Sequence, residues 1–425
     1  MSKWKRIKEW GKNGLIVLLL CSAVWLLADS RLFGHLPWDT VGQSSDPVEQ
    51  TPAPAAGQVT LPMAVAVINT GGVCAARYDA TAVNERFHPL LPILGEAMAG
   101  AEQPLPVQAE QWRAALTQPG SAWLELQGNV PMQVLCRWLA GVDNPALTGS
   151  ARQLLLCARE DGVHLYYRQD DGACYTCVVE GVSADYLQSV LAQAVPNGAG
   201  FAAERAQYAA LSPQTLILAD TPAPEEYAAV NPLAGEQDTD ELLQQLAFAP
   251  GVTTIYQTPE GHRARSGNDT LTISNAGLLS YERAGEEQRY PLAGSEEMPE
   301  VYRAVETARQ LVCGSVQRWS DTAVYLRDVR QEADGWHVEF GYVLNAVPVH
   351  VGDHGACARV LVDGRGVAQY EIWLRSYQPA GKTTLLLPQP QAAAVLEQMG
   401  QTGSGLLLSY LDSGDGVVRA GWMAD

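Results

Sequence analysis

The chain has 425 residues, of which 47% are hydrophobic and 18% charged, a composition typical of globular proteins and unlike that of disordered ones. Its formal net charge of −19 repels phosphate groups, which argues against nucleic-acid binding and against a peripheral contact with anionic lipids. Because domains cluster at about 100–150 residues, this length predicts two or three domains.

The chain opens with a basic tail and an apolar run. Residues 1–13 hold four of the five lysines and a net charge of +4, so the remainder sums to −23. Residues 14–29 begin with the uncharged run GLIVLLLCSAVWLLA. Since basic flanks stay in the cytoplasm, this pattern predicts a single-pass cell-membrane protein with a cytoplasmic N-terminus and extracellular domains.

The apolar run of 15 residues is short for a membrane span, and a cleaved signal peptide is the alternative to an anchor. Signal-peptide cleavage prefers small residues one and three positions before the cut. At Ala28 this pattern fails, because Leu26 stands two residues before it. A retained transmembrane anchor over residues 14–29 is therefore favoured.

Residues 30–58 are predicted to be a linker, because GQSSDPVEQTPAPAAG within them is rich in Pro, Ser and Gln and lacks aromatic residues. Residues 59–235 are predicted to form an N-terminal extracytoplasmic α+β domain. AVAVINT and AWLELQ alternate like strands, whereas NERFHPLLPILGEAMAG, QAEQWRAALTQ and MQVLCRWLAG have helical spacing, the first interrupted by Pro89 and Pro92.

Seven of the eight cysteines follow the predicted anchor, and exported cysteines usually form disulfides. Here most have apolar neighbours, which favours buried core thiols. Cys174 and Cys177 form a CxxC that suggests redox chemistry. However, the flanking sequence predicts a β-hairpin turning at residues 170–172, and in a strand positions i and i+3 point to opposite faces. The pattern therefore favours two unpaired thiols.

An internal repeat organises the C-terminal half. LTISNAGLLSYE and VLVDGRGVAQYE lie 89 residues apart and align Gly277 with Gly366 and Tyr281 with Tyr370. The glycines are expected to adopt positive φ at turns, and the tyrosines to pack across a sheet; a binding role for the tyrosines is the alternative.

Each repeat copy continues into a helical segment and then a strand. Residues 236–320 and 321–425 are therefore predicted to be two copies of a duplicated unit of antiparallel strands plus one helix. Units of this size need a neighbour to complete a core, which predicts that the copies stack their sheets or pack their helices together. The predicted fold class is α+β, a single transmembrane helix followed by mixed extracytoplasmic domains.

The GxSxG and HExxH signatures of serine and zinc hydrolases are absent from the sequence. His350, Asp353, His354 and Cys357 lie close together in VHVGDHGAC and are the residue types that bind zinc. A polar loop between two strands is the favoured interpretation, because no second cluster of ligands accompanies them. We predict no catalytic residue, cofactor or metal site.

Several segments resemble the YycH/YycI (WalH/WalI) regulators of the YycFG (WalRK) two-component system of Gram-positive bacteria. The segments are LSPQTLILADTPAPEEYAAVNP, FAPGVTTIYQTPEGHRARSGNDTLTISNAGLLSYE, EFGYVLNAVPV and ARVLVDGRGVAQYEIWLRSY, preceded by the basic tail and one anchor. The resemblance implies a non-enzymatic, membrane-anchored extracytoplasmic regulator of a sensor histidine kinase, with a homologous regulator left open as a second partner. The alternative is an envelope module that binds peptides or cell-wall fragments.

The resemblance also implies that the anchor lies in the bilayer against the transmembrane helices of the kinase. The anchor residues expected at this contact are Leu15, Ile16, Leu18, Leu19, Leu20, Val24, Trp25 and Leu27.

Overall fold

The computed structural model describes residues 62–234, 239–249, 251–286, 288–414 and 416–425. The predicted tail, anchor and linker lie outside these residues. All described residues belong to one compact unit within Gln50–Asp425. Among the described helices, none has both the length and the apolar character needed to cross a membrane.

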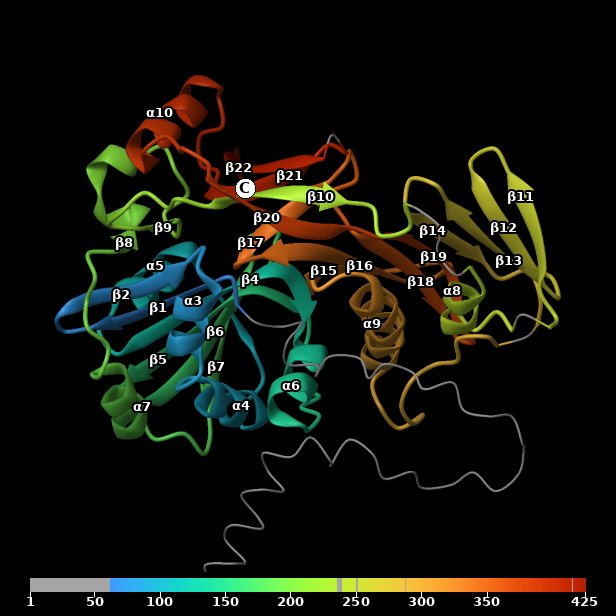
Figure 1. The fold of residues 1–425 in the computed structure, drawn as a ribbon. Coiled ribbons are helices and arrows are strands. Elements are labelled where there is room, and N and C mark those ends of the chain that lie inside the picture. Colours follow the sequence, from blue (N-terminus) through green and yellow to red (C-terminus); the bar gives the residue numbers. More distant parts are fainter. Residues whose placement is uncertain (1–61, 235–238, 250, 287, 415) are drawn as a thin grey trace, which may run out of the picture. The chain divides into compact units, whose positions relative to one another are not determined.

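The N-terminal part of the described chain forms a seven-stranded antiparallel sheet in the order β2-β1-β4-β5-β6-β7-β3 (Figure 1). Its strands are β1 Ala64–Asn69, β2 Gly72–Arg77, β3 Leu105–Val107, β4 Ser121–Pro131, β5 Ser150–Arg159, β6 Gly162–Arg168 and β7 Cys174–Val179. Along β1, Val65 and Val67 join one buried cluster, while Ala66 and Ile68 join another. Both faces of the sheet are therefore covered, which explains the continuous apolar run in AVAVI.

Five helices accompany this sheet, namely α3 Ala80–Phe87, α4 Leu91–Ala99, α5 Ala109–Thr117, α6 Met132–Ala140 and α7 Ala184–Leu191. The predicted helices are confirmed as α3 to α6, with the interruption near Pro89 separating α3 from α4, whereas α7 was not predicted. The N-cap of α3 is Asp79, whose side chain accepts a hydrogen bond from the Ala82 backbone N–H, and α6 ends at Gly141 in the left-handed conformation.

The second sheet has thirteen strands in the order β11-β12-β13-β14-β19-β18-β16-β17-β21-β22-β10-β20, with β15 on β16. The pairs are antiparallel except β17 with β21. The strands are β10 Glu225–Val230, β11 Thr254–Thr258, β12 Gly261–Ser266, β13 Asp269–Ser274, β14 Leu278–Glu282, β15 Ala323–Glu332, β16 Gly335–Leu344, β17 Val347–Val351, β18 Ala358–Asp363, β19 Gly366–Trp373, β20 Ser376–Thr383, β21 Leu406–Asp412 and β22 Val417–Ala424.

The helices of this part are α8 Thr239–Gln245, α9 Glu300–Trp319 and α10 Gln389–Gln398. Short connecting elements are the strands β8 Gly200–Phe201 and β9 Leu216–Ile217 and the 3-10 helices η2 Ala202–Glu204 and η3 Ala206–Tyr208. The helix predicted after each repeat copy is present, as α9 and as α10. The acidic segment before Leu242 begins α8, where Asp240 and Glu241 occupy the first turn.

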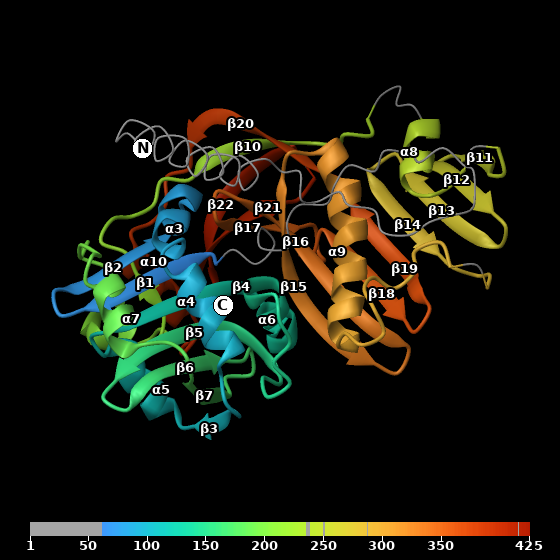
Figure 2. The same cartoon turned by 90° about the horizontal axis from the view of Figure 1, so that it is seen from below.

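The two repeat hairpins, β13–β14 and β18–β19, neither stack as separate sheets nor pack through their helices, contrary to expectation. They join edge to edge, because β14 pairs with β19 and thereby satisfies the backbone groups of both edges. Helix α9 runs along β16, β18 and β19 (Figure 2), whereas α10 contacts η3. One long helix thus covers the β18–β19 hairpin, and the second helix packs elsewhere.

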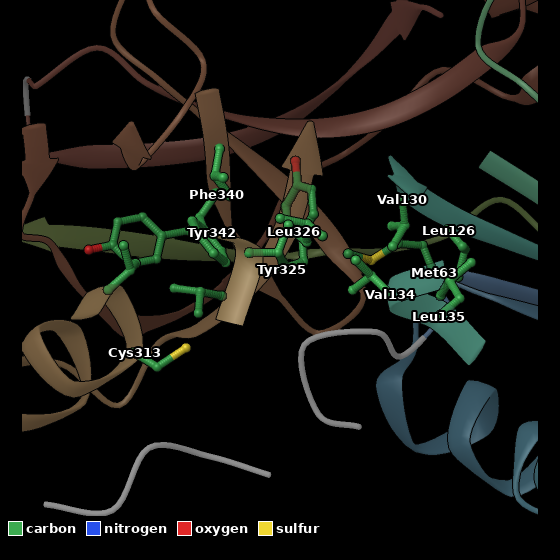
Figure 3. Packing of buried hydrophobic residues seen from close by; sticks show 14 of the residues in the cluster. Met63, Leu126, Val130, Val134, Leu135, Cys313, Tyr325, Leu326, Phe340 and Tyr342 are labelled. Carbon is green, nitrogen blue, oxygen red and sulfur yellow. The ribbon is translucent and has the colours of Figure 1, made fainter. Parts of the chain in front are cut away.

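Strand β4 of the first sheet lies beside β15 of the second sheet. Buried residues of these two strands connect the sheets. Figure 3 shows Tyr325 and Leu326 of β15 between Val130 and Leu135 on one side and Phe340 on the other, all members of one hydrophobic cluster. Strand β10, from the predicted N-terminal domain, pairs with β20 and β22. The largest hydrophobic cluster therefore contains residues of both sheets.

Candidate functional site

The repeat-signature residues lie at the junction of the two hairpins. Tyr281 of β14 and Tyr370 of β19 are direct cross-strand partners, and their buried rings stack with centroids 5.1 Å apart and an interplanar angle of 21°. Gly277 precedes β14 with φ of 86°, and Gly366 begins β19 with φ of 118°. The structure thus brings the two tyrosines together and places both glycines in conformations that favour glycine.

Two further aromatic residues complete what we call the tyrosine cluster, which consists of Tyr281, Tyr290, Tyr370 and Phe248. The ring of Tyr290 packs edge-on against Tyr281 and Tyr370, and Phe248 packs edge-on against Tyr281. The Tyr290 hydroxyl donates a hydrogen bond to the Leu246 carbonyl. Burial raises the pKa of all three tyrosines, so their hydroxyls stay protonated and act as donors.

A buried carboxylate fixes the edge of the cluster. Asp269 is 1% exposed and accepts a hydrogen bond from the Tyr281 hydroxyl at 2.8 Å and from Arg289 Nε at 3.3 Å. The backbone N–H groups of Ala284 and Gly285 donate to the same carboxylate. Arg289 also lies 4.2 Å over the Phe248 ring. The network ties Ala284, Gly285 and Arg289 to the sheet.

The other face of the same strands is polar. Ser280 of β14, Glu371 of β19 and Arg359 of β18 form one cross-strand row that continues to Glu339 of β16. Arg359 Nε lies 3.5 Å from a Glu339 carboxylate oxygen. We call this surface the polar sheet face, made of Ser280, Glu282, His337, Glu339, Arg359, Leu361, Gln369 and Glu371, which line a hollow of about 400 Å³. Its alternating charges suit contact with a polar protein surface.

One group of possible metal ligands stands near this face. Glu332, Asp334 and His337 bring three ligand atoms within 4.8 Å of one another at the β15–β16 turn. The side chains of Asp334 and His337 are hydrogen-bonded to each other at 2.9 Å, and this bond lowers the pKa of Asp334. Exposed acidic groups of this kind are common in turns, and nothing else here indicates an ion.

The CxxC residues lie on opposite faces of β7, as predicted. Cys174 belongs to the buried cluster on one side of the sheet and Cys177 to the cluster on the other. The seven cysteines of the described chain are all free and buried. Burial raises the pKa of the Cys177 thiol to about 12, so it stays protonated near neutral pH and is a poor nucleophile.

The histidine-rich loop is not assembled into a metal site in the described part of the chain. His350 lies in β17, the ring of His354 packs 5.3 Å from that of Trp373, and Cys357 is fully buried. With Asp353, they do not form a group of three ligand atoms within 4.8 Å. Burial, followed by the positive charge of Arg327, lowers the pKa of His350.

Sequence reasoning missed Asp269, Arg289 and Phe248, because each lies outside the aligned repeat copies or at their margin. A signal was present, since Asp269 is the first residue of β13, a strand that alternates apolar residues. The predicted anchor contacts, Leu15 to Leu27, lie outside the described residues.

Comparison with known proteins defines the fold. No protein-family model matches the chain, and neither does any curated protein. This chain is a mixed α+β protein with large antiparallel sheets, and one solved structure is similar to it over most of the length. That structure is the crystal structure of YycH from Bacillus subtilis, with a TM-score of 0.54, 11% sequence identity, and coverage of 89% of this chain and 96% of that chain. At the level of the fold, the predicted resemblance to YycH is confirmed.

Proposed function

We propose that the chain is a non-enzymatic regulator of a two-component sensor histidine kinase, anchored in the cell membrane by residues 14–29 with its folded part outside. The observation that carries this proposal is the YycH-like fold across 89% of the chain. The basic tail and apolar run at the N-terminus support the anchored topology.

The anchor and the folded part have separate roles in this proposal. The apolar residues from Leu15 to Leu27 contact the transmembrane helices of the kinase, and the folded part adjusts that contact through the polar sheet face. A regulator shifts a kinase between two states only by binding one of them more tightly, and a tenfold shift requires about 1.4 kcal/mol of differential affinity. Because the charges of the polar sheet face alternate, the binding free energy of this face for the kinase is expected to depend on salt concentration.

The β13–β14 and β18–β19 hairpins are, in our interpretation, copies of a duplicated unit. Their direct pairing through β14 and β19 and the stacking of Tyr281 on Tyr370 support this view. The pairing creates a continuous polar surface from two short hairpins, which neither copy provides alone.

The proposal is tested by measuring kinase-dependent transcription in cells that carry variants of the full-length chain. Replacing residues 1–29 with an unrelated anchor, or deleting the folded part, is expected to change kinase output. Glu371→Lys on the polar sheet face is expected to change it too, whereas Glu397→Lys on the exposed side of α10 serves as the matched control. Unchanged output in the anchor and deletion variants would rule the proposal out.

A further inference from the structure

A second cavity shares no lining residue with the polar sheet face. Its wall has the polar and charged composition of a small-molecule binding site. Its volume is about 300 Å³, and strands β2, β4, β5 and β6 supply Arg77, Glu125, Arg152, Gln153 and Arg168 to its wall. The remaining wall comes from the segments around Thr215 and Gly405 and from Asp425. We call it the arginine cavity.

Buried polar groups in this wall are incompletely paired. Arg77 and Glu125 form an ion pair at 2.7 Å with side chains only 4% and 6% exposed. Among the described residues, Arg77 Nε, Gln153 Oε1 and Thr215 Oγ1 have no hydrogen-bond partner. A buried polar atom without a partner is unfavourable, and a wall that gathers several of them favours a ligand that supplies donors and acceptors.

The charges of the wall indicate which ligand fits. The wall holds three guanidinium groups and three side-chain carboxylates, so its positive and negative charges are nearly balanced. Arg152 pairs with Asp170 at 2.8 Å and also with Asp425. Within the described chain, Arg168 makes no ion pair. A simple anion would face Glu125, Asp170 and Asp425, and a simple cation would face the arginines. A molecule that carries both charges at separate ends avoids both conflicts.

The size and composition of the arginine cavity narrow the class of ligand further. A volume of about 300 Å³ lies at the lower end of the range for ligand pockets, which suits an amino acid or a dipeptide. The described wall contains no aromatic ring on which a sugar would stack.

We propose that the arginine cavity binds a small zwitterion, an amino acid or dipeptide. Its carboxylate is held by the Arg168 guanidinium, and its ammonium group donates to Gln153 Oε1 and the carboxylates beside Arg152. Charge-assisted hydrogen bonds of this kind are the strongest available to a polar ligand. This inference goes beyond the proposed regulatory role and does not depend on it.

Titration calorimetry of the purified full-length protein with dialanine tests the proposal. We expect saturable binding that is weakened about tenfold or more by Arg168→Gln, which removes one charge-assisted pair. Arg113→Gln, the same substitution on the exposed side of α5, is expected to leave binding unchanged. Gln153→Met is a second cavity variant and is expected to weaken binding as well.

The chemical class is tested with N-acetyl-dialanine amide, which has the same peptide core and neither terminal charge. We expect it not to compete with dialanine. If no saturable binding is seen up to about 10 mM dialanine, the binding free energy is weaker than about 3 kcal/mol. This result would overturn the proposal. Equal binding of the capped peptide, or unchanged binding by Arg168→Gln, would overturn it too. Because kinase output is not measured, these failures are distinguishable from failure of the regulatory role.

Discussion

Gly366→Ala is expected to lower the free energy of unfolding by about 3–5 kcal/mol, because two unfavourable effects add at one position. The backbone of Gly366 has φ of 118°, where a side chain is strained. A Cβ there would also lie 2.0 Å from the Tyr290 carbonyl oxygen. Tyr290 must therefore move, which takes its ring away from Tyr370.

Thermal unfolding and the near-ultraviolet circular dichroism of the tyrosines measure this effect. Gly364→Ala, two residues earlier in the same turn, is the matched control, because its Cβ would meet nothing within 4 Å and its φ is not positive. We expect the control to change stability by less than about 0.5 kcal/mol. Equal melting temperatures for the two variants would show that close packing of Tyr290 against Gly366 does not contribute to stability.

Asp269→Ala is expected to destabilise the protein by about 3–5 kcal/mol, because it leaves the Arg289 guanidinium buried without its counter-ion. The Arg289 side chain is 7% exposed, so water cannot replace the lost carboxylate fully. The substitution also removes the acceptor of the Tyr281 hydroxyl and of the Ala284 and Gly285 N–H groups. Denaturant unfolding followed by tyrosine fluorescence measures the loss.

Two further variants separate the charge effect from the hydrogen bonds. Tyr281→Phe removes a single hydrogen bond and is expected to cost about 1 kcal/mol. Asp269→Ala combined with Arg289→Met removes both charges, and the pair is expected to be more stable than Asp269→Ala alone. If the double variant is less stable than the single one, the buried ion pair is not the source of the effect.

Local structure could be predicted from the sequence wherever periodicity and turn residues agree. The 3.6-residue spacing in residues 299–316 predicts α9, and the CxxC is correctly placed in a strand, because residues 170–172 form a turn signal between two alternating runs. The repeat tyrosines were expected to pack across a sheet, and the structure makes them direct partners. Helix α9 and the CxxC hairpin depend on residues close together in the chain, whereas the tyrosine pair joins strands that are far apart in sequence.

The arrangement of elements far apart in sequence was not predictable in the same way. Pairing of β14 with β19 depends on which edges remain free after folding, and alternation along each strand carries no information about that choice. The Asp269–Arg289 pair and the arginine cavity depend on single polar residues from separate segments. Arg77 and Gln153 are unremarkable in their own strands and become informative only when β4 lies between β1 and β5.

The most direct test of the regulatory proposal is crosslinking of the full-length protein in its native membrane, followed by purification and mass spectrometry of its partners. The proposal predicts recovery of a sensor histidine kinase, and loss of that kinase when residues 15–27 are replaced by an unrelated apolar sequence. Recovery of cell-wall material alone, or of no kinase at all, would contradict it.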